Sequence, residues 1–201
     1  ARPRAVVISL QIVSVQTGTG GCSEAAGIRR GTTAEKLAGL KPAFKEDGVI
    51  HAGNASQISD GAAALLITTS ELAAANGLRP LVRVHTAVLA GADPVIMLTA
   101  PIPATRKALA KSGLTVDQIG AFEVNEAFAP VPLAWLIEVG ADPKALNALG
   151  GAIALGHPLG GSGARLSTTL IHHMRDNGIR YGLQTMCEGG GQANATIFEL
   201  L

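Results

Sequence analysis

Apolar and polar positions change their spacing several times along the chain, and each change marks a predicted element. From residue 81 onward, apolar runs of strand length alternate with stretches whose apolar residues recur every three or four positions. Strands alternating with helices predict an α/β fold, and the last two strands predict an antiparallel hairpin across a glycine loop at 189–191. The expected strands are residues 81–89, 121–124, 181–187 and 193–200, and the expected helices are residues 104–112, 128–139 and 162–177.

The first 80 residues carry a weaker pattern. Residues 6–15 alternate loosely before a glycine-rich loop, and residues 34–40 form a helical stripe that stops at Pro42. The apolar run 62–68 predicts a buried strand, followed by a helix over 71–76 with Ser70 as its N-cap. We expect these elements to need neighbours that this segment does not supply.

Composition narrows the class of protein. Of the 201 residues 47% are hydrophobic and 15% are charged, and the formal net charge is only +1. This balance supports a packed core, and it argues against nucleic-acid binding, which needs a basic excess. No apolar run is long enough to span a bilayer, and two distant cysteines suit a reducing compartment. We therefore expect a soluble, cytoplasmic chain without a membrane or nucleic-acid partner.

Candidate chemistry gathers at glycine-rich positions. His157 precedes Pro158 and a glycine run that turns into a helix, so it could act as a base or as a donor to an oxyanion. The alternative is a loop histidine bonded to a carbonyl. No phosphate-binding loop fits this stretch, because it lacks the lysine and the glycine spacing.

Two further polar residues follow predicted strands. Cys187 stands before three glycines, which places a thiol beside backbone N–H donors, although a lone cysteine is often merely structural. Asn125 either caps the next helix or holds a water in a cleft. Strand exits are where α/β folds place their sites, which favours a functional role for both. His172 and His173 have no spaced partner, so we expect them on a helix surface and predict no metal site.

Together these segments resemble the thiolase family. Asn-Glu-Ala-Phe at 125–128, the glycine-rich histidine stretch at 150–165 and Cys-Glu-Gly-Gly-Gly at 187–191 are similar to its three C-terminal signatures. Residues 52–64 and 91–104 also match, in the family's order, whereas residues 1–30 match poorly. Glu188 differs from the apolar residue of many members.

The resemblance implies a thiolase-like α/β fold in which layered helices surround a mixed five-stranded sheet, with an incomplete N-terminal part. It implies a loop-domain remnant over 1–59, the last strand and helix of the N-terminal domain over 60–80, and the C-terminal domain over 81–201. The family's nucleophilic cysteine has no counterpart here, since Cys187 matches the second cysteine and Cys22 lies in the poorly matching region. The chain is therefore expected to be the C-terminal half of a thiolase, and inactive alone.

The resemblance also implies an activity, acyl-CoA C-acyltransfer that makes or cleaves 3-ketoacyl-CoA by Claisen chemistry. In this interpretation His157 activates the nucleophilic thiol, and Asn125 holds a water that completes the oxyanion hole. Cys187 is the acid/base at the carbon α to the carbonyl, and the Gly189 N–H serves a second oxyanion hole. Asn125, where some relatives carry histidine, points to the acetyl-CoA acetyltransferase or 3-ketoacyl-CoA thiolase groups.

Substrate contacts are implied in the same way. Ala52 and Ser56 match positions that contact the pantetheine of coenzyme A, and Met97, Ala127 and Phe128 match the lining of the acyl pocket. The implied partners are acyl-CoA and coenzyme A, which are substrates, so no resident cofactor is expected. The full-length protein is expected to be a homodimer or homotetramer.

Two other hypotheses remain at this stage. A half-thiolase could bind acyl-CoA or a partner subunit without catalysis, which the missing nucleophile favours. A ketoacyl synthase of the same superfamily is disfavoured, because those enzymes use a second histidine where this chain has Cys187.

Overall fold

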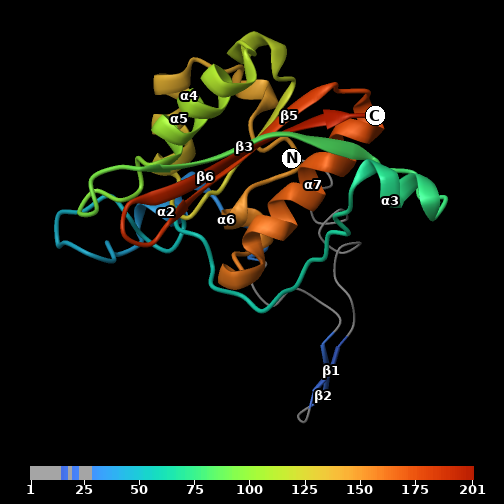
Figure 1. Ribbon diagram of the computed structural model, residues 1–201. Helices are drawn as coiled ribbons and strands as arrows, with labels where there is room; N and C mark the ends of the chain where they lie inside the picture. Colours follow the sequence, from blue (N-terminus) through green and yellow to red (C-terminus); the bar gives the residue numbers. More distant parts are fainter. Residues whose placement is uncertain (1–14, 18–19, 23–28) are drawn as a thin grey trace. The chain divides into compact units, whose positions relative to one another are not determined.

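The computed structural model describes residues 15–17, 20–22 and 29–201, and the chain forms two compact units, residues 1–53 and 54–201 (Figure 1). In the first unit, β1 (Val15–Thr17) pairs antiparallel with β2 (Gly20–Cys22). The helix α2 (Ala34–Ala38) confirms the predicted helical stripe. It begins at Thr33, whose hydroxyl accepts the Lys36 N–H at 3.3 Å. The alternation predicted before residue 15 lies outside the described residues.

The second unit is built on a mixed four-stranded sheet with the order β3-β6-β5-β4. The strand β4 pairs parallel with β5, whereas β6 pairs antiparallel with both β5 and β3. The predicted C-terminal hairpin is therefore confirmed, and the sheet is mixed because one crossover connects parallel strands. The four strands are β3 (Val82–Gly91), β4 (Ala121–Val124), β5 (Tyr181–Glu188) and β6 (Gln192–Leu200).

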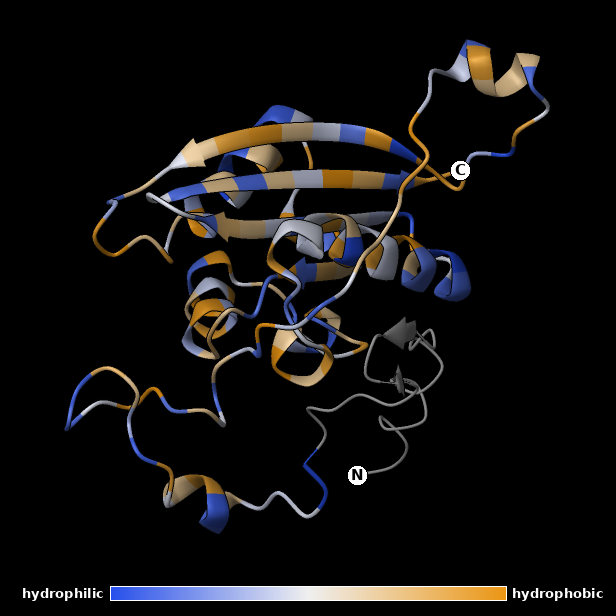
Figure 2. Cartoon of the chain, turned by 90° about the horizontal axis from the view of Figure 1, so that it is seen from below, coloured by the Kyte–Doolittle hydropathy of each residue, from blue (hydrophilic) through white to orange (hydrophobic). Residues whose placement is uncertain are grey.

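Helices cover both faces of this sheet, with α4 and α5 on one side and α7 on the other (Figure 1). Residues on β4 alternate accordingly. Phe122 packs edge to face on Trp135, with ring centroids 5.1 Å apart, whereas Ala121 packs with Leu170 of α7. Apolar and polar segments alternate along the strands in Figure 2. The helices are α3 (Ser70–Ala75), α4 (Pro101–Ser112), α5 (Pro130–Val139), α6 (Ala152–Leu155) and α7 (Ser162–Asn177), with 3-10 turns at Val116–Gln118, Pro143–Ala145 and Leu159–Gly161.

The sheet in the described residues has four strands, one fewer than expected, and an isolated bridge lies beside β4. Leu146 forms an isolated parallel bridge with Phe122, and the Asn147 N–H donates to the Phe122 carbonyl at 2.8 Å. The Asn147 side chain then makes the two hydrogen bonds to Val124 that a neighbouring strand would otherwise make. Its Oδ1 accepts the Val124 N–H at 2.9 Å, and its Nδ2 donates to the Val124 carbonyl at 3.0 Å. Because φ of Asn147 is +46°, the chain turns away from the sheet at this residue.

The predicted buried strand at 62–68 was wrong. These residues form no strand, and Leu66 and Ile67 are 83% and 76% exposed. An apolar run becomes a strand only where another strand satisfies its N–H and C=O groups, and no described strand pairs with it. The predicted cap was also displaced by one residue. Ser70 is the first residue of α3, and the hydroxyl of Thr69 accepts the Leu72 N–H at 3.3 Å.

A buried polar cluster lies between the sheet and α7. Glu123 and Gln184 are neighbours in the parallel β4–β5 register, and Arg165 comes from the first turns of α7. All three guanidinium nitrogens of Arg165 are buried, and none has a hydrogen-bond partner among the described residues. Burial raises the pKa of Glu123 to about 8, against the opposing charge of Arg165. The carboxyl group is therefore mainly protonated at neutral pH.

This raised pKa predicts a pH-dependent stability. The unfolded chain releases the Glu123 proton near pH 4.5 and the folded chain near pH 8, so the contribution of this group to stability is complete below pH 4.5 and is lost as the pH rises through 8. Glu123→Gln mimics the protonated carboxyl. We expect it to match the parent chain in acid and to raise the melting temperature by several degrees above pH 8, at roughly 2–4 °C per kcal/mol.

Thermal melts across this pH range, with exposed Glu46→Gln as the control, measure the effect. A constant difference between Glu123→Gln and the parent chain at every pH would contradict a raised pKa at this position.

The two hydrogen bonds between the Asn147 side chain and the Val124 backbone predict a second effect on stability. Asn147→Ala leaves both backbone groups of the buried Val124 without these partners, which costs about 1–3 kcal/mol. Asn147→Gly tolerates the positive φ and removes only the amide, so it separates hydrogen bonding from backbone strain. Urea denaturation of both variants beside exposed Asn177→Ala checks this, and a Gly variant as stable as the parent would refute the role of the amide.

Candidate functional site

The parallel pairing of β4 and β5 brings two predicted site residues to one edge of the sheet. Asn125 follows β4 directly, and its N–H donates to the Thr185 carbonyl of β5 at 3.0 Å. Cys187 lies two residues beyond Thr185, near the end of β5. Asn125 is not a helix cap, because α5 begins at Pro130 after Ala129. Its side chain is instead buried at the strand exit.

His157 lies between α6 and the amino end of α7, and its side chain reaches Asn125 at the end of β4. The helix α6 ends at Gly156, whose φ of +91° turns the chain sharply, and a Cβ there would collide with the Ser59 side chain. The His157 N–H then donates to the Gln57 carbonyl at 2.9 Å, beside an isolated bridge between Ile58 and His157. These contacts fix the backbone from which the imidazole projects.

Asn125 and His157 meet directly. Asn125 Nδ2 lies 3.5 Å from His157 Nε2, and the Asn125 Oδ1 is buried without a hydrogen-bond partner among the described residues. The other ring nitrogen, Nδ1, lies 2.5 Å from Ser162 Oγ. His157 is 8% exposed, and burial lowers its pKa, with the positive charge of Arg165 acting in the same direction. The imidazole is therefore neutral at physiological pH, as a general base requires.

Cys187 is a partly buried free thiol. Burial raises its pKa, a backbone hydrogen bond opposes this, and the nearby Glu188 carboxylate raises it further. Glu188 itself accepts a hydrogen bond from Asn194 Nδ2 at 2.8 Å. Cys187 shares no hydrogen bond with Asn125 or His157. The thiol is thus protonated at neutral pH and can donate a proton before it accepts one.

The glycine loop after Cys187 is held against the turn that follows β3. The Ala92 N–H donates to the Gly191 carbonyl at 2.7 Å. A Cβ at Gly191 would lie 2.7 Å from the Ala92 oxygen and 2.9 Å from Pro94 Cα, and its φ is +78°. Only glycine fits this position. Gly189 is exposed in the same loop, which leaves its backbone open to a ligand.

Three of the predicted substrate contacts lie side by side in the second unit. The Ser56 N–H donates to the Ala127 carbonyl at 2.9 Å, and Ala55 forms a bridge with Phe128. Met97 lies in the turn before α4 with φ of +55°, a strained value for a residue with a side chain. Its N–H donates to the Asp93 carbonyl at 2.7 Å. Ala52 belongs to the first unit, whereas the other predicted contacts belong to the second.

Two residues that the sequence pattern did not single out complete the site. Ser162 contacts His157 from the first position of α7, and the Glu126 carboxylate accepts the Ile153 N–H at 3.0 Å in the first turn of α6. Both lie inside the segments that carried the resemblance. Their positions in the sequence could have pointed to them, because Ser162 follows His157 by five residues and Glu126 is adjacent to Asn125.

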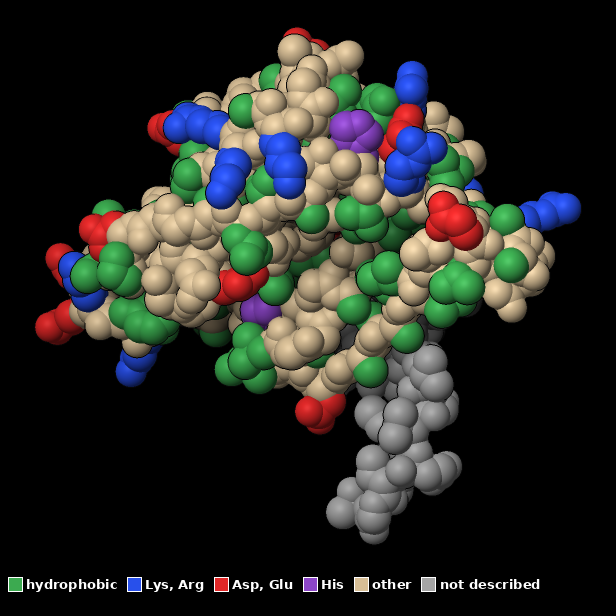
Figure 3. All heavy atoms as spheres, in the orientation of Figure 1, with side chains coloured by type: hydrophobic (Ala, Val, Ile, Leu, Met, Phe, Trp, Pro, Cys, Tyr) green, Lys and Arg blue, Asp and Glu red, His purple; other side chains and the backbone are tan. Residues whose placement is uncertain are grey.

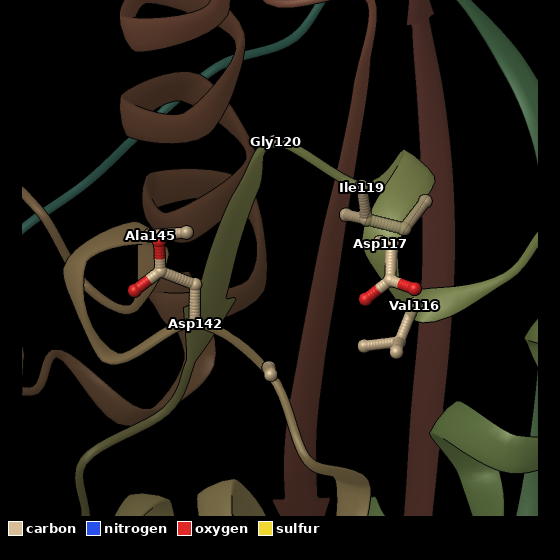
Figure 4. Close-up of a pocket in the computed structure, with 7 residues that line it drawn as sticks. Val116, Asp117, Ile119, Gly120, Asp142 and Ala145 are labelled. Carbon is tan, nitrogen blue, oxygen red and sulfur yellow. The ribbon is translucent and has the colours of Figure 1, made fainter.

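A separate cavity lies at the opposite, amino end of β4 (Figure 4). It has a volume of about 270 Å³ and is lined by Asp117, Gly120 and Asp142 among others.

Within the described part of the chain, no three His, Cys, Asp or Glu side chains form a group suited to a metal ion. No described helix is long and apolar enough to cross a membrane. Basic and acidic side chains are interspersed on the face in Figure 3. Arg180 and Glu199 form an ion pair at 3.1 Å.

Comparison with known proteins identifies the relatives of this chain. The family model described as thiolase, C-terminal domain, matches residues 78–200, and that of the N-terminal domain matches residues 7–71, further upstream than the motifs reach. The steroid 3-ketoacyl-CoA thiolase FadA6 of Mycobacterium tuberculosis is 53% identical over 191 residues, which are 95% of this chain and 46% of the relative.

Solved structures agree. The Bacillus anthracis acetyl-CoA acetyltransferase superposes with a TM-score of 0.90 at 38% identity, over 98% of this chain and 54% of that one. Human mitochondrial 3-ketoacyl-CoA thiolase in complex with CoA gives a TM-score of 0.84 at 37% identity, over 94% of this chain and 48% of that one. The chain thus spans about half the length of the relatives it matches. On these matches and the shared fold, the chain belongs to the thiolase family.

Proposed function

We propose that this chain supplies the histidine and acid/base cysteine of an acyl-CoA C-acyltransferase that makes or cleaves 3-ketoacyl-CoA. The observation that carries the proposal is the buried contact between Asn125 and His157, at the end of the sheet where β5 carries Cys187 one residue before its last residue. Family membership gives this arrangement its chemistry, because the relatives are named as thiolases and acetyl-CoA acetyltransferases. One of them was solved with coenzyme A, which supports coenzyme A and acyl-CoA as the ligands.

In this proposal His157 serves the acylation step. Its neutral Nε2 accepts the proton of the nucleophilic thiol as the thiolate attacks the carbonyl carbon, and the resulting N–H then donates to the oxyanion. The unpartnered Asn125 Oδ1 accepts a hydrogen bond from a water whose second O–H points at the same oxyanion. The nucleophilic cysteine itself comes from outside these 201 residues.

Cys187 serves the carbon–carbon bond step. In cleavage, the enolate of acetyl-CoA leaves and its α carbon takes the proton from Cys187 Sγ, which becomes a thiolate. In condensation, the same thiolate removes that proton. The raised pKa of Cys187 favours the donor form. The backbone N–H of exposed Gly189 serves a second oxyanion hole, and Ser56, Met97, Ala127 and Phe128 contact the substrate.

The remaining features of the proposal follow the family. The working enzyme is a cytoplasmic homodimer or homotetramer that uses coenzyme A as a substrate and needs no resident cofactor. The alternative is a non-catalytic chain that binds acyl-CoA or a partner subunit, and the missing nucleophile favours it for the 201 residues taken alone.

A thiolysis assay separates these two functions. We expect acetoacetyl-CoA and coenzyme A to react only when this chain is joined to the upstream portion of a relative such as the Mycobacterium tuberculosis thiolase, because that portion brings the nucleophile. The 201-residue chain alone is the matched control. Activity of neither protein, together with coenzyme A binding measured by calorimetry, would support the binding function instead.

Substitutions in the active assembly test the division of roles. We expect Cys187→Ala to abolish exchange of the α proton of acetyl-CoA with solvent while the acyl-enzyme still forms, because acylation does not use this thiol. His157→Ala should slow acylation by roughly 10²–10⁴-fold, the usual contribution of a positioned base. Mass spectrometry of the acyl-enzyme and deuterium exchange into acetyl-CoA give the two rates. Loss of both steps in Cys187→Ala, or an unaffected acylation burst in His157→Ala, would contradict the assignments.

A further inference from the structure

Ser162 lies against the Nδ1 side of the His157 imidazole and has no exposed surface. It is the first residue of α7, and its Oγ faces two groups at once. One is Nδ1 of His157 at 2.5 Å, and the other is the carbonyl oxygen of Pro158 at 2.9 Å. The short intervening 3-10 turn, Leu159–Gly161, folds the chain back so that both contacts form.

These two contacts determine where the protons lie. A serine hydroxyl has one proton to donate, and a carbonyl oxygen can only accept. The Ser162 proton therefore goes to the Pro158 carbonyl, and the Oγ lone pair faces the imidazole. A ring nitrogen at 2.5 Å from that lone pair must carry a proton, since two lone pairs in a buried site would repel.

The opposite side of the ring agrees with this assignment. Asn125 Nδ2, which can only donate, faces His157 Nε2 at 3.5 Å. A proton on Nε2 would point two donors at each other. Both flanks of the imidazole thus favour a single neutral tautomer, with the proton on Nδ1 and a lone pair on Nε2.

We propose that Ser162 is a positioning residue that holds His157 in the Nδ1–H tautomer, so that Nε2 is always the basic nitrogen. For the catalytic consequence this inference rests on the function proposed above, but the tautomer is a property of the chain alone. Ser162 acts on the imidazole in the way that a hydrogen-bonded neighbour orients a metal-binding or catalytic histidine.

Removal of the hydroxyl has a defined consequence. In Ser162→Ala nothing at this position accepts the Nδ1 proton, and the Nε2–H tautomer, which cannot take a thiol proton, becomes populated. We expect the acylation rate to fall by roughly 10–100-fold, the scale of losses for groups that orient a ligand or base. Ser162→Thr keeps the hydroxyl and should restore most of the rate. Arg165, the charged group that acts on His157, is retained in both variants.

The direct test measures the tautomer in the 201-residue chain by nitrogen NMR of labelled histidine. His157→Gln assigns the signal among the five histidines. We expect Nδ1–H in the parent chain and in Ser162→Thr, and a mixture or Nε2–H in Ser162→Ala. The control is Ser167→Ala, a buried serine on the same helix. An Nε2–H signal in the parent chain would overturn the proposal without any variant, and an unchanged tautomer in Ser162→Ala would do the same.

The kinetic test uses the active assembly and is read separately. We expect Ser162→Ala to lower the plateau of the pH–rate profile for acylation while KM for acyl-CoA stays constant, and Ser162→Thr to restore the plateau. An unchanged plateau in Ser162→Ala would overturn the catalytic part of the inference. If the tautomer shifts as expected but the assembly with the upstream portion forms no acyl-enzyme, the proposed function fails and the assignment of Ser162 to the tautomer stands.

Discussion

Two strands that run in the same direction, β4 and β5, are paired from Ala121 with Gly182 to Val124 with Thr185. Because the carboxyl ends of both strands lie at the same end of the sheet, the strand pairing itself brings the residues that follow them close together. Asn125 continues this pairing by one hydrogen bond to Thr185. Cys187 lies just beyond it, and the glycine loop then turns back as β6. The candidate site depends on this parallel pairing, and the contacts of His157 and of the glycine loop are added to it.

The amino end of α7 supplies the second half of the arrangement. Its first residue, Ser162, contacts the His157 imidazole, and one turn later Arg165 places a buried positive charge near Glu123. Unpartnered buried polar groups are costly, and here Asn125 Oδ1, Glu123 Oε2 and the Arg165 guanidinium all lie close to the two strand ends. Such groups concentrate where a protein binds water or substrate, and the same burial keeps His157 neutral and Glu123 protonated.

The sequence pattern predicted residues 81–201 well and the first 80 residues poorly. The helix at 162–177 and the hairpin strands at the C-terminus were placed to within a residue, because their periodicity and their glycine ends are local signals. The run at 62–68 has an equally clear apolar pattern, yet it is exposed and forms no strand. The sheet has four strands instead of the expected five, and beside β4 lies the isolated Leu146–Phe122 bridge, which Asn147 follows with a positive φ.

By itself the sequence determined which residues can carry chemistry: a histidine before a glycine-rich helix start, a thiol before three glycines and an asparagine at a strand exit. Residue type and spacing are properties of neighbouring positions, so they can be recognised without the fold. The tertiary structure alone decided that Asn125 faces His157, that Ser162 lies behind the imidazole and that Glu123 is buried beside Arg165. Proton location and pKa depend on burial and on atoms contributed by segments distant in the chain, which no local pattern records.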